Sequence, residues 1–269
     1  MLIRQYKAVA ISLKTPDEIA TMAAAGKAVA MGLDRMKRAI VPGETTTLEL
    51  DEIAREELKK HGAISSLDGY HPSFSAVPYL HAACISINEE VIHGVPSKDR
   101  VIRNGDVVGL DLTAHIDGWH ADSAITVIVG NGTKQAQRLV TITQESLQHG
   151  IKAAQAGATL GDIGFAIQRL VERNGFGIIR ELSGHGIGRS VHEEGLEVAN
   201  FGRPGQGVKL QVGMTFSIEP MTTAGKPGVT HRHDDPWAVI TRDGSIGAHF
   251  EHTVALTESG PVILTALPK

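Results

Sequence analysis

Residues 107–129 read VVGLDLTAHIDGWHADSAITVIV, and this stretch decides the fold. Its two ends, 107–112 and 124–129, are rich in β-branched residues, which favour strands. Asp117-Gly118 lies between them, and this dipeptide is a strong signal for a two-residue hairpin turn. The stretch therefore predicts two antiparallel strands joined by a tight turn.

The predicted hairpin carries Asp111 on its first strand and Asp122 on its second. A turn at either 116–117 or 117–118 would place these residues directly or diagonally opposite each other on one face, because side chains alternate along a strand. Two carboxylates held this close repel each other, and burying them is costly without cations nearby. We therefore expect this face of the hairpin to hold a cationic partner.

Two helices are expected before the hairpin. Thr15-Pro16-Asp17-Glu18 combines a capping residue, a proline at the first helical position and a glutamate at the third, so it predicts a helix that runs to about Ile40. Thr47 is expected to cap a second helix that ends at Gly62. The chain thus places a helix pair before its first strands.

The second half repeats this order, with a helix expected from about 134 to 154, a second helix, and then strands. Matching landmarks occur in the two halves: Gly43, Gly62, Gly105, Asp111 and Asp122 correspond to Gly157, Gly175, Gly213, Glu219 and Glu251. The repeat predicts two α/β halves, about 15–130 and 131–265, related by a pseudo-twofold axis. Each half would send two strand-borne carboxylates to a shared centre.

Four convergent carboxylates supply about four negative charges, which two divalent cations would neutralise. An imidazole could complete such a centre, and the candidate is His185 in Ser183-Gly184-His185-Gly186, where flanking glycines permit close approach. The residues alone therefore predict a centre for two metal ions.

These motifs together resemble type I methionine aminopeptidases. The resemblance rests on Gly-His-Gly-Ile-Gly-Arg around His185 and on the strand-borne Asp111 and Asp122, together with His192-Glu193-Glu194, Ile218-Glu219-Pro220-Met221, Phe250-Glu251-His252-Thr253 and Cys84 to Pro96. It implies an α/β (α+β) pita-bread fold: two pseudo-twofold-related α/β halves with a central antiparallel sheet and the metal site at its centre. Residues 15–269 would form a single catalytic domain behind an N-terminal extension of residues 1–14.

The resemblance also implies a ligand set for two divalent ions, which could be cobalt, manganese, iron or zinc. Asp111 would bind one ion with both oxygens, Asp122 and Glu251 would bridge, and His185 and Glu219 would complete the other. A metal-bridging hydroxide would be the nucleophile in removing the initiator methionine from nascent proteins whose second residue is small.

Further roles are implied for residues that bind substrate. Glu219 would also carry a proton, while His93 and His192 would contact the scissile amide and its oxyanion. Cys84, Tyr79 and Trp237 would line the methionine pocket, with Tyr70 as a rival to Tyr79. The chain departs from the family at Val191, where an aromatic residue is usual, and at Gly195, where a proline is usual.

Composition narrows the other function classes. The net charge is −4, from 26 Lys and Arg against 30 Asp and Glu, which favours neither a nucleic-acid nor a membrane partner. The only cysteine, Cys84, excludes an internal disulfide and suits a reducing compartment. We therefore expect a cytoplasmic protein, with a monomer as the default state. The resemblance implies that it acts on the N-termini of nascent polypeptides near the ribosome.

Two other functions fit parts of the pattern. One is a pita-bread peptidase that cleaves Xaa-Pro bonds, although such relatives usually carry an additional N-terminal domain. The other is a binding protein of the same fold that has lost its chemistry, which the complete ligand set disfavours. The run His231 to Asp235 imitates a metal cluster, but adjacent ligands of this kind rarely converge on one ion, so we interpret it as a polar loop.

Overall fold

The computed structural model describes residues 11–72, 75–233 and 235–267. Most of the N-terminal extension therefore lies outside the described residues, as does Asp234 of the polar loop. Four helices are present in the described part: α1 Pro16–Ala39, α2 Thr47–Lys60, α3 Lys134–Ala153 and α4 Leu160–Arg173. None of them has the length and hydropathy that crossing a membrane requires.

The strands form one large antiparallel sheet and two small ones. The large sheet has the order β1-β4-β5-β14-β9-β7-β8, with β2 paired to β4 and β15 to β14. Its strands are β1 Ile64–Ser65, β2 Ala83–Ile87, β4 Val107–Ile116, β5 Trp119–Ile128, β7 Ser183–Gly186, β8 Glu193–Ala199, β9 Thr215–Ile218, β14 Glu251–Thr257 and β15 Gly260–Ile263. The small sheets contain β6 Gly177–Ile178, β10 Met221–Thr223 and β13 Gly247–His249, and β3 Glu90–Ile92, β11 Val229–His231 and β12 Val239–Thr241.

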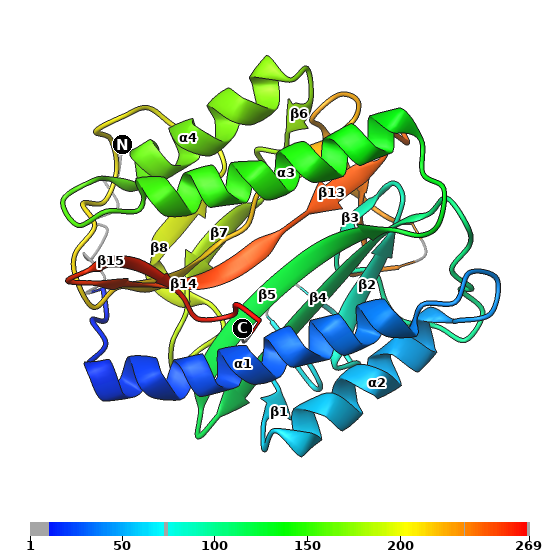
Figure 1. Ribbon diagram of the computed structural model, residues 1–269, viewed down its shortest axis with the longest axis horizontal. Coiled ribbons are helices and arrows are strands. Elements are labelled where there is room, and N and C mark those ends of the chain that lie inside the picture. The colour runs from blue at the N-terminus through cyan, green and yellow to red at the C-terminus, as the bar shows by residue number, and fades with distance from the viewer. Residues whose placement is uncertain (1–10, 73–74, 234, 268–269) are drawn as a thin grey trace.

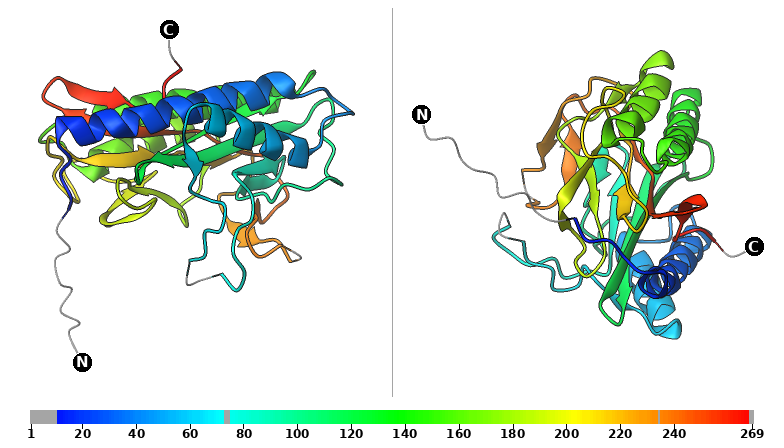
Figure 2. Two further views of the ribbon diagram at one scale, coloured as in Figure 1. Left: turned by 90° about the horizontal axis from the view of Figure 1, so that it is seen from below. Right: turned by 90° about the vertical axis from the view of Figure 1, so that its left-hand side faces the viewer.

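The helices all lie on one face of the large sheet. In Figure 1 the pair α1 and α2 crosses one half of the sheet and the pair α3 and α4 crosses the other. Figure 2 shows the helices on one side and the long loops, including the segment after β1 and the loop between β11 and β12, projecting from the other. The cores follow this division, because one cluster packs Leu33 and Leu50 against Leu110, and another packs Leu147 and Ile163 against Phe216.

The hairpin has the predicted turn but longer strands than predicted. Asp117 and Gly118 have φ values of 52° and 73°, as a type I′ turn requires. The register pairs Asp111 with Ala124 and Thr113 with Asp122. Asp111 and Asp122 are therefore diagonal neighbours on one face, which decides between the two arrangements that the sequence left open.

One predicted cap is wrong by a residue. The first helix begins at the predicted cap, since Thr15 and Glu18 form a capping box. The second is capped by Thr46 rather than Thr47, because Glu49 lies three residues after Thr46 and accepts a hydrogen bond from its backbone N–H at 2.7 Å. Thr47 is the first helical residue, and its hydroxyl donates to the Ser97 carbonyl at 3.1 Å.

The two halves share backbone geometry at the predicted landmarks. The paired glycines have similar positive φ values, namely Gly43 84° and Gly157 88°, Gly62 66° and Gly175 80°, and Gly105 95° and Gly213 92°. Their amides make equivalent bonds: Gly43 to Ile102 and Gly157 to Leu210, then Gly105 to Val129 and Gly213 to Leu256. The mixed α/β architecture with its central antiparallel sheet agrees with the expected fold class.

Candidate metal centre

A cavity of ≈470 Å³ is lined by side chains from the face of the large sheet that the helices leave free. Along β4, Leu110 and Leu112 pack into the helix-covered core, so the intervening Asp111 faces the cavity. All the residues assigned to the site from sequence line this cavity: Asp111, Asp122, His185, Glu219, Glu251, His93, His192, Cys84, Tyr79 and Trp237.

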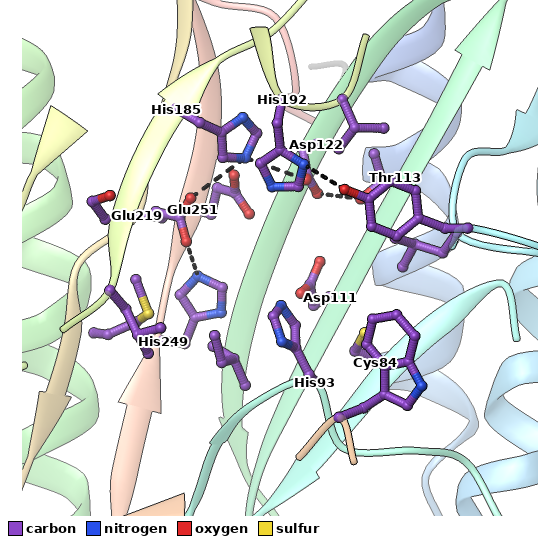
Figure 3. Close-up of a pocket in the computed structure, with 18 of the residues that line it drawn as sticks. Cys84, His93, Asp111, Thr113, Asp122, His185, His192, Glu219, His249 and Glu251 are labelled. Carbon is purple, nitrogen blue, oxygen red and sulfur yellow. Dashed lines mark hydrogen bonds and ion pairs between the residues drawn. The ribbon is translucent and has the colours of Figure 1, made fainter. Parts of the chain in front are cut away.

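The five expected metal ligands come from neighbouring strands. Asp111 lies on β4 and Asp122 on β5, Glu251 begins β14, Glu219 directly follows β9, and His185 lies on β7. Because β4, β5, β14, β9 and β7 are consecutive in the sheet, these side chains meet over its middle. Figure 3 shows the carboxylates and imidazoles pointing toward one another there.

Two overlapping groups of potential ligand atoms lie within 4.8 Å of one another: Asp122, His185 and Glu251, and Glu219, His249 and Glu251. His185 Nε2 is 4.0 Å from Asp122 Oδ2 and 3.6 Å from Glu219 Oε1. Asp111 joins neither group, although it lines the same cavity. Four of the five expected ligands are therefore clustered closely, and Glu251 is common to both groups.

Hydrogen bonds from the surrounding strands hold these carboxylates in place. The Thr113 hydroxyl donates to Asp122 Oδ1 at 2.7 Å, and the Ser217 hydroxyl donates to Glu219 Oε1 at 2.9 Å. Asn200 Nδ2 donates to the Glu219 carbonyl at 2.9 Å. Such supporting contacts fix the orientation of ligand side chains before a cation binds.

The tautomer of His185 follows from its neighbours. Its Nδ1 is 3.0 Å from the Gly186 carbonyl, which can only accept, so Nδ1 carries the proton. The Nε2 lone pair then faces Asp122 and Glu219. A neutral imidazole in this tautomer is the form that binds a metal ion.

Burial and mutual repulsion shift the carboxylate pKa values. Burial, followed by the negative charges of Asp122 and Glu219, raises the pKa of Asp111 well above its usual value. Burial also raises the pKa of Asp122, against the lowering effect of His185. The pKa of Glu251 is well above its usual value because of burial and the charges of Asp122, Glu219 and Asp111.

Glu219 behaves differently. Burial acts to raise its pKa, but the nearby imidazoles of His249 and His185 and the hydrogen bond from the Ser217 hydroxyl together lower it below the usual value. Glu219 is therefore the carboxylate that ionises most readily in the cluster. For the other three, burial opposes ionisation, and an added positive charge would favour their ionised forms.

The donor set fits divalent cations. Oxygen ligands dominate, one imidazole presents a free lone pair, and buried Glu251 Oε1 and His249 Nε2 have no hydrogen-bond partner within the described residues. Cations would neutralise the crowded carboxylates and occupy these unpaired atoms. The cluster therefore has donor atoms of the kinds that bind divalent cations.

Metal binding is expected to release protons. The raised pKa values of Asp111 and Glu251 favour their protonated forms, and a cation competes with those protons, so metal affinity should increase as pH rises toward neutrality. Titration calorimetry with Mn²⁺ in buffers of different ionisation enthalpy should show a net release of protons near pH 6. Heats that do not depend on the buffer would contradict this electrostatic account.

The two expected catalytic histidines lie on opposite sides of the cluster. His93 follows β3 with a φ of 61°, a left-handed conformation that a histidine rarely adopts. Burial lowers its pKa to about 4, so the ring is neutral at physiological pH. His192 lies at the cavity rim, where its ring centroid is 4.1 Å from that of His185 and its Nδ1 is 3.1 Å from the Tyr70 hydroxyl.

The expected methionine pocket is one apolar cluster. Tyr79, Cys84 and Trp237 are buried together, and the rings of Tyr79 and Trp237 meet edge to face at 5.2 Å. The Tyr79 hydroxyl donates to the Ala83 carbonyl at 2.9 Å. Tyr70 packs against the same cluster and also lines the cavity, so the two tyrosines are both present at the site.

The structure shows the surroundings of Val191 and Gly195, the two residues at which the chain departs from the family pattern. Val191 is buried and lines the cavity directly before His192. Gly195 has a φ of 94° within the irregular pairing of β7 and β8, a conformation that the ring of proline excludes. The backbone conformation at this position of β8 therefore excludes proline and favours glycine.

His249 is the residue that sequence reasoning missed. It is buried, its Nε2 is 3.6 Å from Glu219 Oε2, and it precedes Glu251 by two positions. The alternation of side chains along a strand could have placed it on the same face as Glu251. His252 lies on the opposite face of the strand and does not line the cavity, and its Nδ1 is 2.8 Å from the Thr265 hydroxyl.

The polar run at 231–235 joins no metal cluster among the described residues. Arg232 forms an ion pair with Glu90, and Asp235 Oδ1 accepts hydrogen bonds from the Trp237 and Ala238 amides. These contacts fix the loop that carries Trp237. In the described part of the chain, this loop therefore holds Trp237 in the apolar cluster with Tyr79 and Cys84.

Comparison with known proteins agrees with this geometry. The chain is 44% identical over 255 residues to the methionine aminopeptidase of Clostridium acetobutylicum, covering 95% of this chain and 98% of that protein. It is 46% identical over 259 residues to the methionine aminopeptidase of Aquifex aeolicus, covering 96% and 100%.

Solved structures agree as well. The methionine aminopeptidase of Thermotoga maritima superimposes with a TM-score of 0.90 at 42% identity, covering 95% of this chain and 99% of the other. The prolidase of Pyrococcus furiosus shares the fold at 23% identity and a TM-score of 0.75, and this chain covers 66% of it. Both have the pita-bread fold, which confirms the expected fold class. The sequence model of metallopeptidase family M24 matches residues 20–258, and the chain belongs to that family.

Proposed function

We propose that this protein is a metal-dependent aminopeptidase that removes the initiator methionine from new proteins whose second residue is small. The observation that carries the proposal is the position of the carboxylate cluster beside the apolar pocket of Tyr79, Cys84 and Trp237 in one cavity. The methionine aminopeptidases compared above support it, because they align over nearly their whole length.

The proposed centre holds two divalent ions, of cobalt, manganese, iron or zinc. Asp111, Asp122, His185, Glu219 and Glu251 would hold these ions, and the place of Glu251 in both groups of potential ligand atoms supports this assignment. When bound, the ions would supply Lewis acidity for the attacking water and the scissile carbonyl.

The protein's own residues would bind the substrate and move its protons. The N-terminal methionine side chain enters the apolar pocket, and its amide lies between His93 and His192 at the two sides of the cluster. His93, held neutral by burial, donates a hydrogen bond to the developing oxyanion, and His192 orients the amide. Glu219, with its lowered pKa, accepts a proton from water and passes it to the leaving amine.

His249 is proposed to orient Glu219. Its buried Nε2 lies 3.6 Å from Glu219 Oε2, while Ser217 donates to Oε1. The two contacts act on opposite oxygens, so they restrain rotation of the carboxylate. This arrangement would keep Glu219 aligned during proton transfer.

The cellular setting is proposed on the same grounds. A cytoplasmic enzyme that meets N-termini of nascent polypeptides near the ribosome would encounter its substrates as they form. We propose that residues 15–269 act as a single catalytic domain and that the protein is a monomer. Migration in size-exclusion chromatography at the mass of one 28.6 kDa chain would agree with the last point.

A peptide assay tests the proposed function. Manganese-loaded protein is expected to release methionine from Met-Ala-Ser at least about tenfold faster than from Met-Leu-Ser, because a larger second side chain must crowd the approach to the cluster. Free methionine is measured by chromatography. Equal rates would refute the selectivity, and preferred cleavage of an Ala-Pro peptide would instead identify an Xaa-Pro peptidase.

A further inference from the structure

Lys14 and Glu193 form an ion pair in an unusual place. The Lys14 side chain is only 1% exposed and the Glu193 side chain 17%. Lys14 Nζ also donates to the Ser12 carbonyl at 3.1 Å. Burying a charged pair is costly, so a pair kept in this position calls for a reason beyond stability.

The pair is enclosed by the loop that leads to His192. Glu193 Oε1 accepts a hydrogen bond from the Arg189 amide at 3.0 Å. Gly188 leaves room for both partners, since a Cβ there would lie 2.3 Å from Glu193 Oε1 and 2.5 Å from Lys14 Cε. The loop from 188 to 193 therefore closes around the carboxylate of Glu193.

Lys14 is itself fixed at its backbone. Its N–H donates to the Gly213 carbonyl at 2.7 Å, and the next residue, Thr15, caps α1. The amine thus projects from a segment held between the turn before β9 and the first helix. It provides a firm anchor for the more exposed loop.

Glu193 and His192 are adjacent, and their side chains reach opposite sides of the chain. Glu193 opens β8 and pairs with Gly186, while His192 lines the cavity beside His185. Because Glu193 directly follows His192 in the chain, a restraint on the Glu193 side chain also restrains the backbone that carries the His192 ring.

We propose that the buried Lys14–Glu193 ion pair positions His192 over the metal centre from behind. The proposal rests on the proposed function for the consequence in catalysis, but the position of His192 is testable without it. Lys14 and Glu193 act as positioning residues, since neither lines the cavity.

The test uses Lys14→Met in the full chain, with Lys60→Met as its matched control. Lys60 forms an ion pair with Glu57 at 3.0 Å on α2 and does not line the cavity. The control variant therefore also removes a lysine from an ion pair, but away from the cavity. For Met-Ala-Ser, Lys14→Met is expected to lower kcat about tenfold, because small displacements of a catalytic group are costly. KM and Mn²⁺ affinity should change less than about twofold, as should kcat of the control.

A second readout does not depend on catalysis. In histidine-labelled protein, Lys14→Met should shift or broaden the imidazole resonances of His192 and leave those of half-buried His252 unchanged. If Lys14→Met does not fold, Glu193→Gln serves instead, since its amide oxygen can still accept a hydrogen bond from the Arg189 amide while the charge is lost.

Unchanged His192 resonances with an unchanged kcat would overturn the proposal, as would a kcat loss explained entirely by lost metal. An inactive parent protein would refute the proposed function alone, and the resonances would still decide the positioning role.

Discussion

Glu251→Gln is expected to lower kcat for Met-Ala-Ser by at least about 10³-fold, because the cluster loses the one carboxylate that belongs to both ligand groups. The side chain is 2% exposed, and glutamine has the same shape, so the loss would be one of charge and coordination. The measurement is kcat at saturating Mn²⁺, with metal content determined on the same sample. Asp122→Asn should behave in the same way, because Asp122 shares a ligand group with Glu251.

The same substitution should leave the metal-free protein at least as stable as the parent. Glu251 is repelled by Asp122, Glu219 and Asp111, which is why its pKa is raised. A raised pKa means that ionisation destabilises the folded state as pH rises above the unfolded value, and glutamine removes this cost. We expect a gain of about 1 kcal/mol at pH 7.5, or roughly 2–4 °C in the unfolding midpoint without metal.

Glu258→Gln provides the control, since this carboxylate is exposed on the turn after β14. It should alter neither activity nor stability. Normal turnover of Glu251→Gln after metal repletion would eliminate the proposed mechanism. A large loss of stability in the metal-free variant would show instead that Glu251 is a structural residue.

His93→Ala is expected to reduce kcat by about 10²–10³-fold, the usual effect of removing one donor to an oxyanion. Desolvation lowers the pKa of His93 to about 4, so its ring is neutral and able to donate throughout pH 5–8. Titration of His93 should therefore make no contribution to the pH dependence of kcat between pH 5 and 8. Steady-state kinetics between pH 5 and 8 measure both effects, with exposed His149→Ala on α3 as the control.

His93→Gly separates catalysis from backbone strain. His93 has a φ of 61°, and the next residue is held close to β2, where a Cβ on Gly94 would lie 2.3 Å from the Ile85 carbonyl oxygen. Glycine tolerates this conformation and alanine does not, so the Gly variant should be more stable than the Ala variant by about 1 kcal/mol. Both variants should show the same loss of kcat. Equal stability of the two variants would mean that the strain is absent, and full activity of either would remove His93 from the mechanism.

Local sequence signals were sufficient for the elements that frame the site. Asp117-Gly118 specifies a type I′ turn, and this turn fixes the register that places Asp111 and Asp122 on one face. The capping box at Thr15 specifies where α1 begins. These features depend only on residues within a few positions of each other, so they can be predicted from a short stretch of sequence.

Other features depend on contacts between distant segments. One example is the first turn of α2, where the Thr47 hydroxyl donates a hydrogen bond to the Ser97 carbonyl, fifty residues further along the chain. The tyrosine that lines the pocket was ambiguous for the same reason, because the long segment between Tyr70 and Tyr79 returns both to the cavity. No periodicity within the segment itself distinguishes such outcomes.

The carboxylate pattern, the hairpin and the glycine landmarks were determined by the sequence itself, because strand alternation and turn chemistry act locally. Only the tertiary structure decided that His249 meets Glu219 and that Lys14 meets Glu193. The first contact requires β14 to lie between β5 and β9, and the second joins residues 179 positions apart. Each depends on the free energy of packing whole strands and helices together, which no short stretch of sequence encodes.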